Sequence, residues 1–131
     1  MIAVDSNVLL RLLVNDDAAQ AIKARRLFDD MAGEDGSIWA SDMVLVEIVW
    51  TLARAYQRPR LELVAVLRAL TCHATIALES TAAVPAAIAT FESGPADFAD
   101  CLLAEKARLR GCDRLITFDK GMRELPGVKL L

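Results

Sequence analysis

Short apolar runs alternate along this chain with longer segments whose apolar residues recur three and four positions apart. Short runs are typical of buried strands, and the longer spacing is typical of amphipathic helices. The expected strands are residues 2–4, 37–40, 74–78, 114–118 and 128–131. The expected helices are residues 20–31, 43–56, 61–70, a segment beginning near residue 80, and 96–110. Strands and helices that alternate in this way predict parallel β-α-β units with right-handed crossovers.

Capping and breaking residues mark the ends of the expected helices. Ser41 is the expected cap of the long apolar helix, and Pro59 breaks the chain before the next helix. Ser80 or Thr81 is the expected cap of the fourth helix, and Gly111 ends the last. The pattern predicts a three-layer α/β/α sandwich with a mainly parallel sheet of about five strands. In such sheets, ligands gather outside the carboxyl ends of the strands.

Length and composition favour one globular domain over residues 1–131. The chain has 131 residues, 55% of them hydrophobic, which is enough for one core and too little for two ordinary domains. No apolar run reaches the roughly 18 residues of a membrane span, and no secretory leader pattern is visible. We therefore expect a soluble, cytoplasmic protein without a membrane partner. Cys72, Cys101 and Cys112 fit no zinc or disulfide pattern and are expected to be buried, reduced thiols.

The charge balance argues against a protein that holds nucleic acid through its overall electrostatic field. The formal net charge is -3 at pH 7, whereas such proteins are usually basic. Local basic patches remain, each of which also fits a solvated helix face. They are Lys23, Arg25 and Arg26, and the more widely spaced Arg54, Arg58, Arg60 and Arg68.

The most informative polar residues are acids near the ends of the expected strands. Asp5 interrupts two apolar runs in MIAVDSNVLL, where a turn residue or helix cap is the simplest interpretation. Glu47 and Thr51 are the only polar residues of MVLVEIVWTLA. A helix this apolar is expected to be buried on most sides, so an ionised Glu47 needs an ion-pair partner or a bound cation unless its carboxylate reaches solvent.

Three further acids follow in the second half of the chain. Asp97 and Asp100 lie three residues apart at the start of the last expected helix, where acids also complement the helix dipole. Asp100 is the stronger candidate, because the apolar Cys101 follows it directly. Asp119 comes just after the strand that ends near Thr117, a position that also suits an ordinary turn residue.

A parallel sheet would bring several of these carboxylates to one edge, where they could not all ionise without a counter-charge. A divalent cation resolves that conflict, and all-oxygen ligands favour Mg²⁺ or Mn²⁺ over zinc. The only histidine, His73, lies away from the acids and is expected to be structural or at the surface. Carboxylates with a divalent ion, and no nucleophilic Ser or Cys with a partner His, indicate phosphate-ester hydrolysis by an activated water. Ser6, Asn7 and Thr117 are the expected supporting polar groups.

Four segments, covering essentially the whole chain in order, carry a family resemblance. They are AVDSNVLLRLL, SDMVLVEIVWTLAR, DFADCLLAEKARLRGC, and LITFDKGM followed by GVKLL. Each is weak alone, but their order and spacing resemble the PIN-domain ribonucleases, and within them the VapC-type toxins of bacterial toxin-antitoxin systems.

The resemblance implies a site, an activity and partners. The acids that match the family's quartet are Asp5, Glu47, Asp100 and Asp119. Asp5 and Asp100 would be the principal Mg²⁺ ligands, and Asp97 is the alternative to Asp100. The implied activity is endoribonuclease cleavage by a homodimer that a small antitoxin neutralises. The net charge then requires local RNA contacts, for which Arg54, Arg58 and Arg60 are the candidates.

Three other functions are consistent with parts of the pattern. A haloacid-dehalogenase-like phosphatase also has an Asp after its first strand, but it needs a second Asp two positions on, where this chain has Asn7. A receiver-like signalling domain needs a phosphoacceptor Asp after the third strand, where this chain has Glu79. A catalytically inactive PIN-like binding module is the non-enzymatic alternative, and it would not require metal binding.

Overall fold

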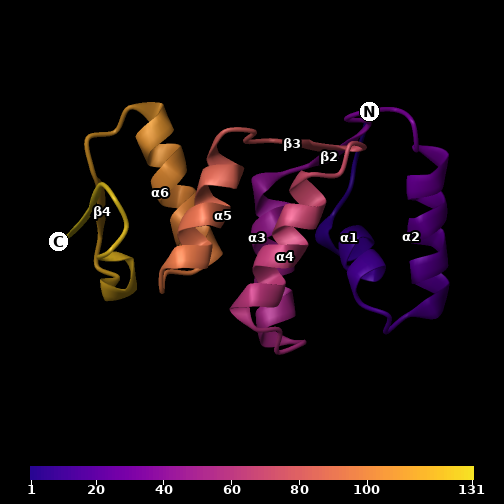
Figure 1. Ribbon diagram of the computed structural model, residues 1–131, viewed down its shortest axis with the longest axis horizontal. Helices are drawn as coiled ribbons and strands as arrows, with labels where there is room; N and C mark the ends of the chain where they lie inside the picture. Colours follow the sequence, from indigo (N-terminus) through magenta and orange to yellow (C-terminus); the bar gives the residue numbers. More distant parts are fainter. The chain divides into compact units, whose positions relative to one another are not determined.

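The five expected strands are all present, and every pairing between them is parallel. A computed structural model describes residues 1–131, which divide into two compact units, Met1–Glu79 (unit 1) and Ser80–Leu131 (unit 2) (Figure 1). The strands are β1 (Ile2–Ala3), β2 (Ile38–Ala40), β3 (Ile76–Leu78), β4 (Leu115–Thr117) and β5 (Val128–Leu130). They form a three-stranded sheet, β1-β2-β3, and a two-stranded sheet, β4-β5. The predicted α/β class with parallel strands is confirmed, with the five strands divided between two sheets.

Unit 1 contains four helices around the three-stranded sheet. They are α1 (Ser6–Leu13), α2 (Ala18–Asp30), α3 (Asp42–Arg54) and α4 (Arg60–Thr71). The central strand β2 places Ile38 opposite both Ile2 and Ile76, and Ile38 is fully buried. Helix α1 packs against α2 and α3, and α3 packs against α4. The buried side chains of Leu9, Leu45 and Ile48 join Ile38 in this core, where each such side chain contributes about 1.5–3 kcal/mol of hydrophobic stabilisation.

Unit 2 is built on two helices that lie side by side (Figure 1). They are α5 (Ala83–Ser93) and α6 (Phe98–Arg110), and a short 3₁₀ helix, η1 (Lys120–Met122), follows β4. The rings of Phe91 and Phe98 meet edge to face, with 6.0 Å between their centroids, and both are buried. This contact joins the end of α5 to the start of α6. It therefore fixes the turn on which Asp97 and Asp100 lie.

Two helix predictions need correction. The pattern predicts no helix at α1, since Asp5, Ser6 and Asn7 interrupt the apolar residues there. The structure explains these polar residues: Asp5 is the N-cap of α1, and Ser6 is its first residue. The predicted capping of α5 by Ser80 or Thr81 is wrong, since the helix begins after Ala82 without a side-chain cap. The αL conformation of Gly111 at the end of α6, with φ of 89°, confirms the expected stop.

The cysteine prediction holds for one residue of three. Cys101 is buried in α6, whereas Cys72 and Cys112 are exposed, and all three are free thiols. Cys72 is the C-cap of α4, and Cys112 comes directly after Gly111, the C-cap of α6, so both lie outside the helices. None of the helices is both long enough and apolar enough to cross a membrane.

Candidate active site

Asp5 begins the candidate site in unit 1, just beyond β1. Its Oδ1 accepts a hydrogen bond from the backbone N–H of Val8 at 3.1 Å, which caps α1. One carboxylate oxygen is thereby held in place while the side chain stays exposed. Ser6 is buried with 3% of its surface exposed, and Asn7 is exposed beside Asp5. The three polar residues thus form a capped strand-to-helix turn that presents Asp5 and Asn7 to solvent.

Glu47 lies on the exposed side of α3, which corrects the expectation that this helix would enclose it. The helix buries Leu45, Ile48, Val49 and Leu52 on its other side. An exposed carboxylate needs no partner in order to ionise, so burial gives no argument for a cation at Glu47. Its candidacy rests on its position in the chain and on the family.

The acid that α3 does bury is Asp42, which the sequence pattern did not single out. Asp42 has 8% of its surface exposed and is the first residue of the helix. Ser41 caps α3 as expected, its hydroxyl accepting the N–H of Val44 at 3.2 Å. The carboxylate of Glu79 accepts the backbone N–H of Asp42 at 3.1 Å, so the end of β3 is tied to the start of α3. Acids next to strand ends in unit 1 therefore also serve as caps.

Asp97 and Asp100 have different structural roles at the start of α6. Asp97 is the N-cap, and its Oδ1 accepts the backbone N–H of Asp100 at 2.9 Å. Asp100 lies within the first turn and is partly buried. The carboxylate of Asp97 is thus engaged in capping, whereas Asp100 uses only its backbone in this bond.

Asp119 and Thr117 form a tight turn beyond β4. The Thr117 hydroxyl accepts the N–H of Asp119 at 3.0 Å, and Asp119 Oδ1 accepts the N–H of Gly121 at 2.8 Å. A Cβ atom at Gly121 would lie 3.0 Å from Asp119 Oδ1, closer than an unstrained contact allows. Gly121 therefore positions the carboxylate, a role that the sequence pattern alone did not reveal.

Asp100, Asp97 and Asp119 interact electrostatically within unit 2. Burial, the negative charge of Asp97, a side-chain hydrogen bond with Asp97 and the negative charge of Asp119 together raise the pKa of Asp100 to about 6, with burial the largest cause. Ionisation of Asp100 is thus opposed by desolvation and by two neighbouring carboxylates. A divalent cation would offset both effects, and oxygen-only donors suit Mg²⁺ or Mn²⁺. The charges around Asp100 therefore favour such an ion, although Asp97, Asp100 and Asp119 do not form a complete set of ligands by themselves.

The acids are divided between the two units. Asp5 and Glu47 belong to unit 1, whereas Asp97, Asp100 and Asp119 belong to unit 2. Within neither unit do three His, Cys, Asp or Glu side chains converge as a complete set of metal ligands. His73 contacts none of these acids: its Nδ1 accepts the N–H of Thr75 and its ring meets Phe28 edge-on.

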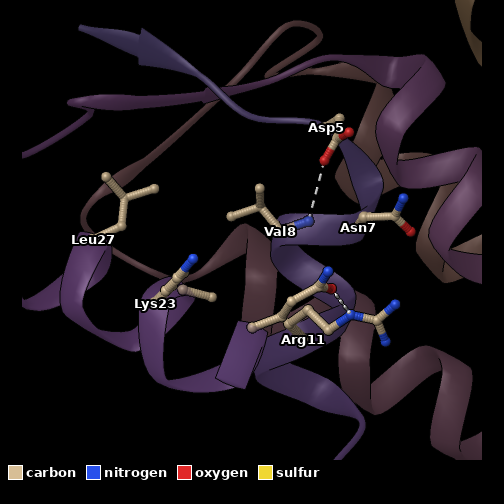
Figure 2. A pocket seen from close by; sticks show the side chains of 8 residues that line it. Asp5, Asn7, Val8, Arg11, Lys23 and Leu27 are labelled. Atoms are coloured by element: carbon tan, nitrogen blue, oxygen red, sulfur yellow. Dashed lines mark hydrogen bonds between the residues drawn. The ribbon is translucent and has the colours of Figure 1, made fainter. Parts of the chain in front are cut away.

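A hollow of about 360 Å³ adjoins Asp5 within unit 1 (Figure 2). Its walls come from the start of α1 and the facing side of α2. The lining residues are Asp5, Asn7, Val8, Arg11, Gln20, Lys23, Ala24 and Leu27. Lys23 and Leu27 are four residues apart on α2, a spacing that places them on one helical face. The pattern identified Lys23 as part of a basic cluster, but only the structure connects it with Asp5.

The three candidate RNA-binding arginines lie in and after the end of α3. The Arg54 guanidinium lies over the Trp50 ring, 5.9 Å from its centroid, and Trp50 has 60% of its surface exposed. Arg58 pairs with Glu62, with 3.3 Å between Nη1 and Oε2, which offsets part of its charge. Arg60 is the first residue of α4. Arg54 and the exposed Trp50 thus form a cation-aromatic pair at the end of α3.

Comparison with known families identifies the chain. A model of the PIN domain family matches residues 2–128. This match spans nearly the entire chain, and the chain therefore belongs to the PIN domain family. PIN domains are generally nucleases that use divalent metals, so the chain has a nuclease-type fold. No curated protein sequence matches the chain.

Proposed function

We propose that this protein is a Mg²⁺- or Mn²⁺-dependent endoribonuclease that acts as the toxin of a toxin-antitoxin pair. The observation that supports hydrolysis most directly is the electrostatic environment of Asp100, where burial and two acidic neighbours favour a bound cation. Family membership supports nuclease chemistry. The resemblance of the four sequence segments to VapC-type toxins supports the more specific role.

The proposed catalytic acids are Asp5, Glu47, Asp100 and Asp119, with Asp5 and Asp100 as the metal ligands. A bound divalent ion supplies charge neutralisation at the phosphoryl oxygens and a more acidic attacking water. The hydrogen bond from Val8 holds one oxygen of Asp5, so the other is available as a ligand. The bonds from Gly121 and to Thr117 fix the direction of the Asp119 turn. Ser6, Asn7, Asp97 and Thr117 support this set by capping and by polar contact.

The test of this activity compares variants that differ from wild type in one carboxylate. Purified protein is incubated with total RNA and Mg²⁺, beside Asp5→Asn, Asp100→Asn and wild type with a chelator. Cleavage by wild type alone supports the proposal. A wild type that binds RNA without cutting it would instead indicate the inactive binding module.

RNA binding is proposed to use Arg54, Arg58 and Arg60. Exposed aromatic rings and arginines are common contacts for unpaired RNA bases and phosphates, and Arg54 beside exposed Trp50 offers both. Charge reversal at the three arginines should weaken RNA binding and lower its salt dependence. Unchanged affinity and an unchanged salt slope would exclude this surface as the RNA contact.

The toxin role is proposed with a small antitoxin as partner and a homodimer as the active form. The toxin role is tested by measuring the growth of a bacterial host after expression of the protein is induced. Asp5→Asn is the control, which should not arrest growth. Light scattering of the purified protein tests the homodimer, and a monomer at micromolar concentration would contradict it. Growth arrest that persists in Asp5→Asn would contradict a toxin role that depends on the proposed nuclease site.

A further inference from the structure

The hollow beside Asp5 has the composition of a binding site for a negatively charged group. It lies between α1 and α2, and Figure 2 shows Lys23, Arg11 and Asn7 around the space next to Asp5. Its volume of about 360 Å³ falls within the range of ligand pockets in proteins. Its lining residues include one acid, Asp5, and two cations, Arg11 and Lys23, so positive side chains outnumber negative ones.

Hydrogen bonds fix which donors the hollow can offer. Arg11 Nε donates to Gln20 Oε1 at 2.7 Å, and Arg11 Nη1 donates to Asp16, which also accepts a bond from Tyr56. The oxygen of Gln20 is therefore occupied, and its amide nitrogen remains as a donor. The guanidinium of Arg11 likewise has further N–H groups that these two bonds do not use.

Lys23 provides the uncompensated charge. It makes no ion pair and no hydrogen bond in the structure, whereas the charge of Arg11 is partly offset by Asp16. A lysine ammonium is a compact, mobile charge that suits a phosphate oxygen. The remaining wall is apolar, formed by Val8, Ala24 and Leu27. A charged donor set over an apolar wall suits a nucleotide, whose phosphate is ionic and whose sugar and base have less polar faces.

We propose that this hollow is a subsite for the RNA nucleotide adjoining the scissile phosphate, with Lys23 contacting a backbone phosphate oxygen. Arg11, held in place by Gln20, and the Gln20 amide are the secondary donors. This inference rests on the proposed ribonuclease function, because Asp5 marks where the scissile phosphate would be bound. The subsite explains how an acidic chain can hold RNA next to its carboxylates.

The first test measures RNA binding in chelator, where no cleavage occurs. The affinity of an unstructured RNA oligonucleotide is determined over a salt series for wild type, Lys23→Gln and Lys23→Arg. The matched control is Arg25→Gln, which removes the same charge two positions along α2, is exposed, and does not line the hollow. One lost phosphate contact on a single strand should reduce the slope of log affinity against log salt by about 0.7.

We expect Lys23→Gln to weaken binding several-fold and to show this change in slope, Lys23→Arg to retain both, and Arg25→Gln to leave the slope near that of wild type. If Lys23→Gln and Arg25→Gln behave alike, the subsite is refuted. Thermal melting of each variant shows whether it is folded.

The second test separates this inference from the proposed function. With Mg²⁺ present, Lys23→Gln should raise KM for RNA several-fold and leave kcat nearly unchanged, because Lys23 positions the substrate without touching the reacting atoms. If wild type cleaves RNA and KM is unchanged in Lys23→Gln, the subsite is wrong and the ribonuclease proposal stands. If wild type cleaves no RNA, the ribonuclease proposal fails, and the salt slopes still decide whether Lys23 contacts RNA.

Discussion

The carboxylate of Asp97 accepts the backbone N–H of Asp100 at 2.9 Å, so the two acids of the DxxD segment have separate structural roles. Asp97 satisfies a backbone donor that the first turn of α6 would otherwise leave unpaired. Asp100 remains available as a ligand, and the charge of Asp97 contributes to its raised pKa. This arrangement favours Asp100 over Asp97 as the metal ligand that we propose.

We predict that substitutions at these two positions separate stability from activity. Asp97→Asn preserves a good N-cap and should change stability by only a few tenths of a kcal/mol, whereas Asp97→Ala should cost about 1 kcal/mol. Asp100→Asn should abolish cleavage and leave the fold intact. Denaturant unfolding and RNA cleavage of the three variants provide the measurement. Full activity in Asp100→Asn, with loss in Asp97→Asn, would reverse the assignment.

The raised pKa of Asp100 predicts a pH-dependent stability in the absence of metal. The pKa rises from 3.8 to about 6 on folding, so between these values the native state holds a proton that the unfolded state has lost. This contribution to stability is fully present below about pH 4 and disappears as pH rises through 6. Asp100→Asn should therefore gain stability relative to wild type between pH 4 and pH 7. The measurement is the urea midpoint of unfolding of wild type and Asp100→Asn across this pH range, in chelator. The same dependence of the midpoint on pH in both proteins would contradict this prediction.

Gly121 is predicted to matter for activity more than for folding. A methyl group there would lie 3.0 Å from Asp119 Oδ1 and would displace the carboxylate. The carboxylate would have to move by only a fraction of the roughly 1 Å misplacement that can cost about 100-fold in rate, so Gly121→Ala should reduce RNA cleavage by up to about 10-fold. Gly94→Ala is the control, because its Cβ would make only an ordinary contact of 3.5 Å with the Thr90 carbonyl. Equal activity of both variants would show that the position of Asp119 is unimportant.

The core of unit 2 is predicted to depend on Phe98. This ring is 1% exposed and contacts Phe91, so Phe98→Ala should cost about 3–5 kcal/mol through lost burial and the remaining cavity. Leu103, on the same helix, is 51% exposed, and Leu103→Ala should change stability by no more than about 0.5 kcal/mol. Chemical unfolding of the two variants compares them directly. A similar loss for both would mean that the exposed face of α6 is covered in solution.

Most of the fold could be predicted because hydrophobic spacing reports secondary structure directly. The strands and five of the six α-helices follow from it, including the stop at Gly111. Helix α1 could not be predicted in this way, because its polar first turn follows a strand of only two residues. The division of the strands between two sheets depends on long-range pairing, which periodicity does not encode.

The candidate site could be predicted from the sequence only in part. Acids at strand ends could be recognised, and the capped turns of Asp5 and Asp119 show why small polar residues surround them. The sequence left a solvent-reaching Glu47 as one alternative and could not select it, since an apolar helix does not reveal which of its faces is covered. The proximity of Lys23 to Asp5 depends on how α2 packs against α1, and it appears only in the folded structure.

RNA cleavage by wild type and Asp5→Asn in Mg²⁺ tests metal-dependent hydrolysis most directly. An Asn at this position still caps α1, so the two proteins should melt at nearly the same temperature and differ only in the carboxylate. We predict that wild type cuts RNA, that chelator stops it, and that Asp5→Asn is inactive with an unchanged melting temperature. Equal cleavage by both folded proteins, or cleavage that persists in chelator, would contradict a carboxylate-held metal ion as the source of activity.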